Sequence, residues 1–126
     1  MLITIADVLT ALIGAFAVFF LGANAFRAPQ AAAGFGIPGT PTSDPAFHAW
    51  LRVKAVRDIA TGLFTFILLA AATPHLVGWF MLAAAAIPAG DALIVLRSNG
   101  PKAAAYGIHG ATAAVMLATS VLLFVG

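Results

Sequence analysis

The sequence predicts an all-α fold: a transmembrane four-helix up-down-up-down bundle with the N and C termini on the same side. Its 126 residues are 63% hydrophobic and only 8% charged, and the mean hydropathy is +1.07. A soluble domain carries about 25% charged residues, so this chain could not cover its own surface with polar groups. Lipid is the expected solvent, and apolar segments that cross it must be helical to satisfy their own backbone groups. We expect one integral membrane domain over residues 1–126.

The expected helices are joined by short connections, apart from one long loop. The helices cover residues 2–26, 45–72, 75–97 and 101–125, and a loop rich in glycine and proline covers residues 27–44. Asp44 is the expected N-cap of the second helix, and Pro45 occupies its first position. Pro101 opens the last helix in the same way. The prolines and glycines of the loop are expected to forbid regular structure there.

The first segment also allows an interpretation as a secretory signal peptide, because Ala23 and Ala25 resemble a cleavage site. A signal peptide carries basic residues near its start, and this chain has Asp7 there instead. The apolar run is also longer than the roughly 7–15 residues of such a peptide. We therefore expect a first transmembrane helix.

Basic residues predict the orientation of the bundle. All six lie in or beside the first and third connections, and none lies on the side of the termini. Cytoplasmic loops of membrane proteins carry an excess of lysine and arginine. The sequence therefore predicts a multi-pass protein of the cell (inner) membrane. Both termini would lie outside, and loops 27–44 and 97–102 would be cytoplasmic.

Polar residues inside the expected helices are the candidate functional residues, because a charge in a membrane helix costs a few kcal/mol. Asp91 lies six residues before Arg97, which places it about 9 Å inward at 1.5 Å per residue. His109 lies seven residues after Lys102, about 10 Å inward. Pro88 is expected to kink the third helix close to Asp91. The candidate ligand-binding residues are Asn24, Lys54, Arg57, Asp58, Asp91, Tyr106 and His109.

These side chains come from four helices but share the cytoplasmic half of the membrane, so they are expected to form one polar layer. Burying them requires pairing and hydrogen bonding. We expect Arg57 to pair with Asp91, and Lys54 or His109 to pair with Asp58 or Asp91. A purely structural network is the competing interpretation, in which Arg57 and Asp58 extend to the membrane surface as an anchor.

The sequence also resembles a known family. The residues that carry the resemblance are Asn24, Arg27, Pro29, Gly34-Phe35-Gly36, Lys54, Arg57, Asp58, Gly62, Asp91 and His109, and the pattern Lys-x-x-Arg-Asp-x-x-x-Gly at Lys54–Gly62 is the most specific. The chain is similar to small four-helix integral membrane proteins grouped as domain of unknown function 4267. The resemblance implies the fold and supports the polar positions as a site. It implies no activity.

Four functions fit the polar layer. The first is a pocket that binds a small amphipathic or lipid-like ligand. The second is an intramembrane acid–base enzyme of isomerase or cyclase type, with His109 or Asp91 as the catalytic base. The third is a proton-coupled transporter, for which a homo-oligomer is expected because a bundle of four helices is thin for a complete pathway. The fourth is a structural subunit of a larger complex. Three scattered histidines give no metal site, and we expect no cofactor and no nucleic acid.

Overall fold

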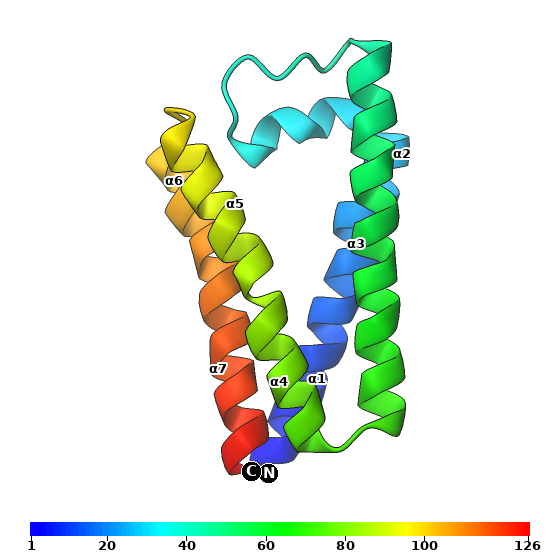
Figure 1. Cartoon of the computed structure of the whole chain (residues 1–126), viewed down its shortest axis with the longest axis vertical. Coiled ribbons are helices and arrows are strands. Elements are labelled where there is room, and N and C mark those ends of the chain that lie inside the picture. Colours follow the sequence, from blue (N-terminus) through cyan, green and yellow to red (C-terminus); the bar gives the residue numbers. More distant parts are fainter.

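The computed structural model describes all of residues 1–126, and every regular element in it is helical (Figure 1). The first helical stretch contains α1 (Leu2–Ala15), the π-helix η1 (Phe16–Ala23) and α2 (Asn24–Arg27), followed by the 3-10 helix η2 (Pro29–Phe35). The second is α3 (Pro45–Ala71), and the third contains α4 (Pro74–Ala84) and α5 (Ala86–Arg97). The fourth contains α6 (Lys102–Ala104), the π-helix η3 (Ala105–Gly110) and α7 (Ala111–Val125). The all-α prediction is confirmed.

Local chemistry sets where these helices begin. The Asp44 carboxylate accepts a hydrogen bond from the Ala46 amide at 2.8 Å, and Pro45 follows as the first helical residue of α3. The Thr73 hydroxyl accepts from the Leu76 amide at 3.3 Å at the start of α4. Such caps satisfy amide groups that have no partner inside the helix. The break between α4 and α5 comes just before Pro88, which lacks the amide that would bond to the carbonyl four residues earlier.

Three helical stretches are long and apolar enough to cross a membrane. They are Leu2–Arg27, Pro74–Arg97 and Lys102–Val125, with mean hydropathies of 2.3, 1.9 and 1.9. At 1.5 Å per residue each exceeds the hydrocarbon thickness of about 30 Å. By length and composition the chain is therefore a multi-pass membrane protein. The helix α3 is not among the three, because Arg52, Lys54, Arg57 and Asp58 lie in its first half.

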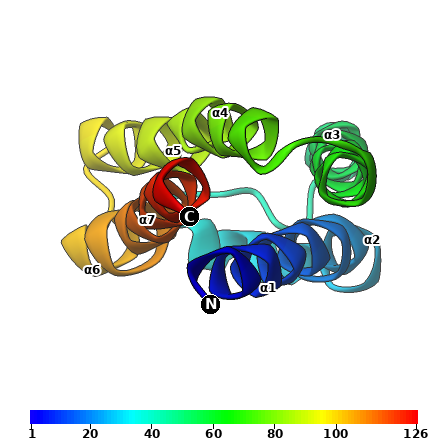
Figure 2. The ribbon, with the colours of Figure 1, turned by 90° about the horizontal axis from the view of Figure 1, so that it is seen from below.

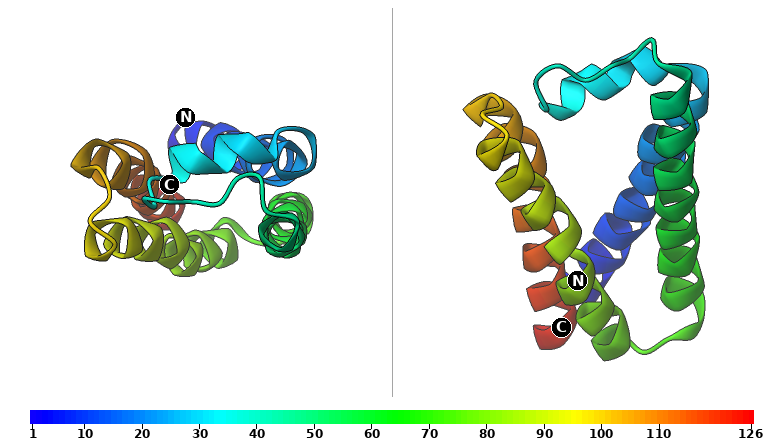
Figure 3. Two further views of the ribbon diagram at one scale, coloured as in Figure 1. Left: turned by 90° about the horizontal axis from the view of Figure 1, so that it is seen from above. Right: turned by 45° about the horizontal axis from the view of Figure 1, so that its top comes forward.

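The helices form two arms (Figure 1). In the first arm α3 packs along α1 and η1. In the second arm α4 packs along α7, and α5 packs along η3. The arms meet where α1 contacts α7, at the end where both termini lie (Figure 2). They diverge toward the opposite end, where η2 lies across the space between them (Figure 3).

The hydrophobic core lies at the end where the arms meet. Its buried residues are Ala6, Val77, Met81, Ala84, Ala85, Met116 and Leu123. Here the Ser120 hydroxyl of α7 donates a buried hydrogen bond of 2.9 Å to the Gly78 carbonyl of α4. Within the first arm, a Cβ on Gly62 would lie 2.6 Å from a methyl of Val18. The absence of a side chain at Gly62 therefore permits α3 to approach the first helical stretch. The wide end of the molecule has no comparable core between the arms, and this leaves room for a cavity.

The expectation that residues 27–44 hold no regular structure is wrong for Pro29–Phe35, which form η2. Gly36 ends this helix with a φ of 105°, a conformation that residues with a side chain rarely adopt. A Cβ on Gly36 would lie 2.8 Å from Ala104 and 3.1 Å from Val95. The loop is therefore fastened to the second arm.

Candidate functional site

A cavity of about 740 Å³ lies between the arms and beneath η2. Each wall contributes positions that share one helix face. From α3 these are Phe47, Leu51, Lys54, Asp58, Thr61 and Thr65; from the third stretch Ala84, Ile87, Pro88 and Asp91; and from the fourth Ile108, His109, Thr112 and Met116. Spacings of three and four residues bring such positions to one face. Most of the lining is apolar, and the polar groups are few.

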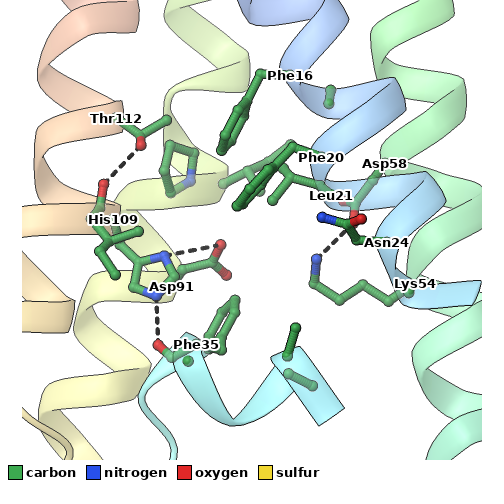
Figure 4. Close-up of a pocket in the computed structure, with 18 of the residues that line it drawn as sticks. Phe16, Phe20, Leu21, Asn24, Phe35, Lys54, Asp58, Asp91, His109 and Thr112 are labelled. Atoms are coloured by element: carbon green, nitrogen blue, oxygen red, sulfur yellow. Dashed lines mark hydrogen bonds and ion pairs between the residues drawn. The ribbon is translucent and has the colours of Figure 1, made fainter. Parts of the chain in front are cut away.

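One polar group on the first arm is an ion pair within α3. The Lys54 ammonium lies 2.7 Å from the Asp58 carboxylate, and the two residues are four apart on the helix. Figure 4 shows Asn24 of α2 beside this pair. The Lys54 ammonium also lies 5.8 Å from the centre of the Phe35 ring, within the range of a cation–π contact. The two charges neutralise each other inside the cavity.

The second polar group lies on the opposite wall. His109 of η3 is buried, and its Nδ1 lies 4.0 Å from Oδ2 of Asp91 on α5 (Figure 4). The other ring nitrogen, Nε2, lies 2.7 Å from the Phe35 carbonyl oxygen of η2. A carbonyl can only accept, so Nε2 carries the proton and donates. In the neutral imidazole Nδ1 is then a free acceptor that faces a carboxylate.

Phe35 connects these groups, and sequence reasoning missed it. Its carbonyl accepts from His109, and its ring lies 4.3 Å from the imidazole, measured between ring centres. The same ring lies under Lys54 of the other arm. The signal that could have found Phe35 is the glycine on each side of it. Gly36 supplies the left-handed turn that brings Phe35 against the second arm.

Both π-helical segments border the cavity. The segment η1 ends directly before Asn24, and η3 contains His109. π-Helical turns are rare and occur frequently at functional sites, because the extra residue in the turn re-aims the side chains that follow. Their position at two walls of one cavity marks the cavity as the candidate site.

The structure brings five of the expected ligand-binding residues together: Asn24, Lys54, Asp58, Asp91 and His109 all line the cavity. It does not bring Arg57 or Tyr106 there. Arg57 is exposed and donates to the Val53 carbonyl of its own helix at 3.1 Å, and Tyr106 is 61% exposed. The expected ion pair of Arg57 with Asp91 is therefore absent. The ion pair formed is Lys54–Asp58, and the neutral imidazole of His109 lies 4.0 Å from the Asp91 carboxylate.

No group of three or more histidine, aspartate or glutamate side chains could hold a metal ion. The fold and the site define an all-helical, multi-pass membrane protein with a mostly apolar cavity between its helices. Two polar groups line this cavity: Lys54 with Asp58, and His109 with Asp91.

The comparison with protein families identifies the particular group. Residues 15–123 match the family described as Domain of unknown function (DUF4267), and the chain belongs to that family. The resemblance carried by the pattern at Lys54–Gly62 is thereby confirmed. A comparison with the curated proteins found no match, and a comparison with the solved structures found none.

Proposed function

We propose that this membrane protein binds a small amphipathic or lipid-like molecule in the cavity between its two arms. The observation that carries the proposal is the cavity itself, of about 740 Å³ and with contributions from every helical stretch. Ligand sites in proteins typically measure about 300–1,000 Å³ and combine apolar walls with a few polar groups. Apolar walls suit a hydrocarbon chain, and the polar groups suit a head group.

The aromatic residues of η1 support a role for the walls in holding a hydrocarbon chain. Phe16 and Phe20 both line the cavity, and their rings stack at 4.8 Å between centres. The threonines of the walls are compatible with a hydrocarbon chain, because their hydroxyl groups already donate hydrogen bonds within their own helices. Thr61, Thr65 and Thr112 each donate to the carbonyl four residues earlier in their own helix.

The proposed membrane arrangement has four spans, with α3 as the fourth. Both termini face outside, and residues 27–44 and 97–102 face the cytoplasm. Two features support it: the six basic residues cluster on the side away from the termini, and the termini lie together at one end of the molecule (Figure 1). The polar end of the cavity then lies in the cytoplasmic half of the membrane.

The binding proposal is tested by filling the cavity. Ala17 lines it, and Ala17→Trp would occupy the space of a ligand chain. Ala70 is exposed and does not line the cavity, so Ala70→Trp adds the same side chain to the outer surface. Native mass spectrometry of the purified proteins is expected to detect a retained amphiphile in the wild type and in Ala70→Trp, but not in Ala17→Trp. Equal retention by all three proteins would contradict a ligand in the cavity.

An intramembrane acid–base enzyme is the second candidate, and one observation favours it. The 4.0 Å between His109 Nδ1 and Asp91 Oδ2 is too long for a hydrogen bond but short enough for one bridging atom, with cavity space alongside. An enzyme would convert the retained molecule, and Asp91→Asn would stop the conversion while binding persisted. A chemically unchanged ligand after prolonged incubation would speak against this candidate.

A further inference from the structure

The charges that line the cavity do not cancel. Lys54 and Asp58 neutralise each other at 2.7 Å. His109 uses its one proton in the bond to the Phe35 carbonyl, and the side chain of Asp91 accepts no hydrogen bond from the protein. A carboxylate among apolar walls is costly unless a partner neutralises it. With His109 neutral, no cation of the chain forms a direct pair with Asp91, so a positive charge from outside the chain can take that place.

The geometry beside Asp91 indicates which class of cation fits there. Oδ2 of Asp91 and Nδ1 of His109 are two acceptors 4.0 Å apart. An atom about 2.9 Å from each, the usual length of such a hydrogen bond, fits between them. It must carry two protons, one for each acceptor. A protonated amine with two or more N–H bonds meets this requirement. A hydroxyl group has only one proton to donate, and a quaternary ammonium has none.

Other head groups are less well matched. An anionic head group would need a free cation, but Arg57 points away from the cavity and Lys54 is already paired with Asp58. A neutral head group would leave the charge of Asp91 unbalanced. The aromatic rings of Phe16, Phe20 and Phe35 lie around the same space in Figure 4, and ring faces attract cations.

We propose that the cavity takes a long-chain primary or secondary amine, whose ammonium group bridges Asp91 Oδ2 and His109 Nδ1. This inference rests on the proposed binding function and assigns its ligand class. The chain of the amine lies along the apolar wall formed by η1. The ammonium could belong to a free amine or to the head group of an aminophospholipid, which share the same chemistry.

Titration calorimetry in an uncharged detergent tests the inference with four probes of equal chain length. Dodecylamine has both the charge and the N–H bonds, dodecyltrimethylammonium has the charge alone, and dodecanol and dodecanoate have neither. The wild type is expected to bind dodecylamine at least about tenfold more tightly than the trimethyl compound, since hydrogen bonds to charged groups contribute about 1.5–3 kcal/mol. Equal affinities would overturn the inference.

Two variants test whether the preference for dodecylamine depends on Asp91 and His109. Asp91→Asn is nearly isosteric and is expected to abolish the preference for dodecylamine. His109→Gln keeps a donor for the Phe35 carbonyl but removes Nδ1, and it is expected to reduce the preference. Asp7→Asn is the matched control, because Asp7 is a carboxylate in α1 that does not line the cavity, and it should leave the preference unchanged. A preference that survives in Asp91→Asn would overturn the inference.

The remaining outcomes separate this inference from the binding proposal. If dodecanol or dodecanoate binds best and Ala17→Trp blocks it, the cavity binds amphiphiles but the amine assignment is wrong. If none of the four probes binds, both proposals fail. A short-chain phosphatidylethanolamine that competes as well as dodecylamine would support the ammonium site and assign it to a lipid head group, whereas weaker competition would assign it to a free amine.

Discussion

Among single residues, His109 has the widest set of roles, because it joins the loop above the cavity to the wall beside it. Nε2 donates to the Phe35 carbonyl at 2.7 Å, the ring packs on the Phe35 ring, and Nδ1 faces Asp91. The imidazole therefore fixes η2 and presents an acceptor to the cavity at the same time. Loss of the ring nitrogens would loosen the loop even where the packing was kept.

The variant His109→Phe tests the fastening of the loop. It keeps an aromatic ring against Phe35 but leaves the carbonyl without its donor, at a cost of about 1–3 kcal/mol if that carbonyl stays buried. Hydrogen exchange of residues 29–36 is expected to speed up by tenfold or more. His75→Phe is the control, because His75 packs on Phe124 far from the loop. Unchanged exchange in His109→Phe would show that other contacts hold η2.

A second residue-scale test uses two glycines of the same loop. Gly36→Ala places a methyl group at a φ of 105° and within 3.1 Å of both Ala104 and Val95, so we expect the free energy of unfolding to fall by about 1–3 kcal/mol. Gly34→Ala meets nothing within 4 Å and is expected to change it little. Equal stabilities, measured by unfolding in detergent, would contradict the docking of Gly36 on the second arm.

At the scale of the elements, α4 and α7 are joined by a polar contact inside an apolar interface. The Ser120 hydroxyl donates to the Gly78 carbonyl across the two helices. Thr119, its neighbour, is equally buried but donates to the Val115 carbonyl of its own helix. Only the first of these bonds can hold the helices together.

Substitution of the two residues separates these roles. Ser120→Ala is expected to lower the free energy of unfolding by about 0.6–1 kcal/mol, the usual contribution of a hydrogen bond between membrane helices. Thr119→Val preserves shape and removes only an intrahelical bond, so it should change stability by less. The comparison is made by titration with a denaturing detergent. A larger loss in Thr119→Val would contradict the assignment.

The all-α class was predictable because the helix ends carry strong local signals. Asp44 with Pro45 marks the start of α3, and Pro101 directly precedes α6. The helix η2 could not be predicted in this way, since it depends on distant contacts of Gly36 with Val95 and Ala104. The π-helical segments likewise have no sequence signal that we could read.

The candidate site was predictable where an α-helical face repeats, as with Lys54, Asp58, Thr61 and Thr65. Arg57 is adjacent to Asp58 and therefore points in another direction, toward a carbonyl of its own helix. Tyr106 was expected among the ligand-binding residues and lies three positions before His109, but both residues lie in the π-helix η3. A π-helix has more residues per turn, so positions three apart no longer share a face.

For the whole molecule, α3 is the element whose place in the membrane matters most. Its uncharged part, Ile59–Ala71, rises about 20 Å at 1.5 Å per residue, which is less than the hydrocarbon thickness of about 30 Å. If α3 spans the membrane, Lys54 and Asp58 lie at the edge of the hydrocarbon, where the pair borders the cavity. Arg57 can then extend along the helix to the surface.

Single-cysteine labelling tests this topology without background, because the chain has no cysteine. Ser43→Cys and Asn99→Cys lie in the two connections expected in the cytoplasm, and both should react with an impermeant thiol reagent only after the cells are opened. Thr73→Cys lies in the connection expected outside and should react in intact cells. Reaction of Ser43→Cys and Thr73→Cys from the same side would show that α3 does not cross the membrane.

An amphiphile in the cavity is the central proposal for this protein. Photolabelling with a long-chain amine that carries a diazirine in its chain tests it most directly. Peptide mapping is expected to place label on cavity-lining residues such as Phe16, Phe20 and Phe35. Excess dodecylamine should remove that label, and Ala17→Trp should prevent it. Label confined to outward-facing residues such as Phe19 and Leu12, and unaffected by competitor, would contradict the account.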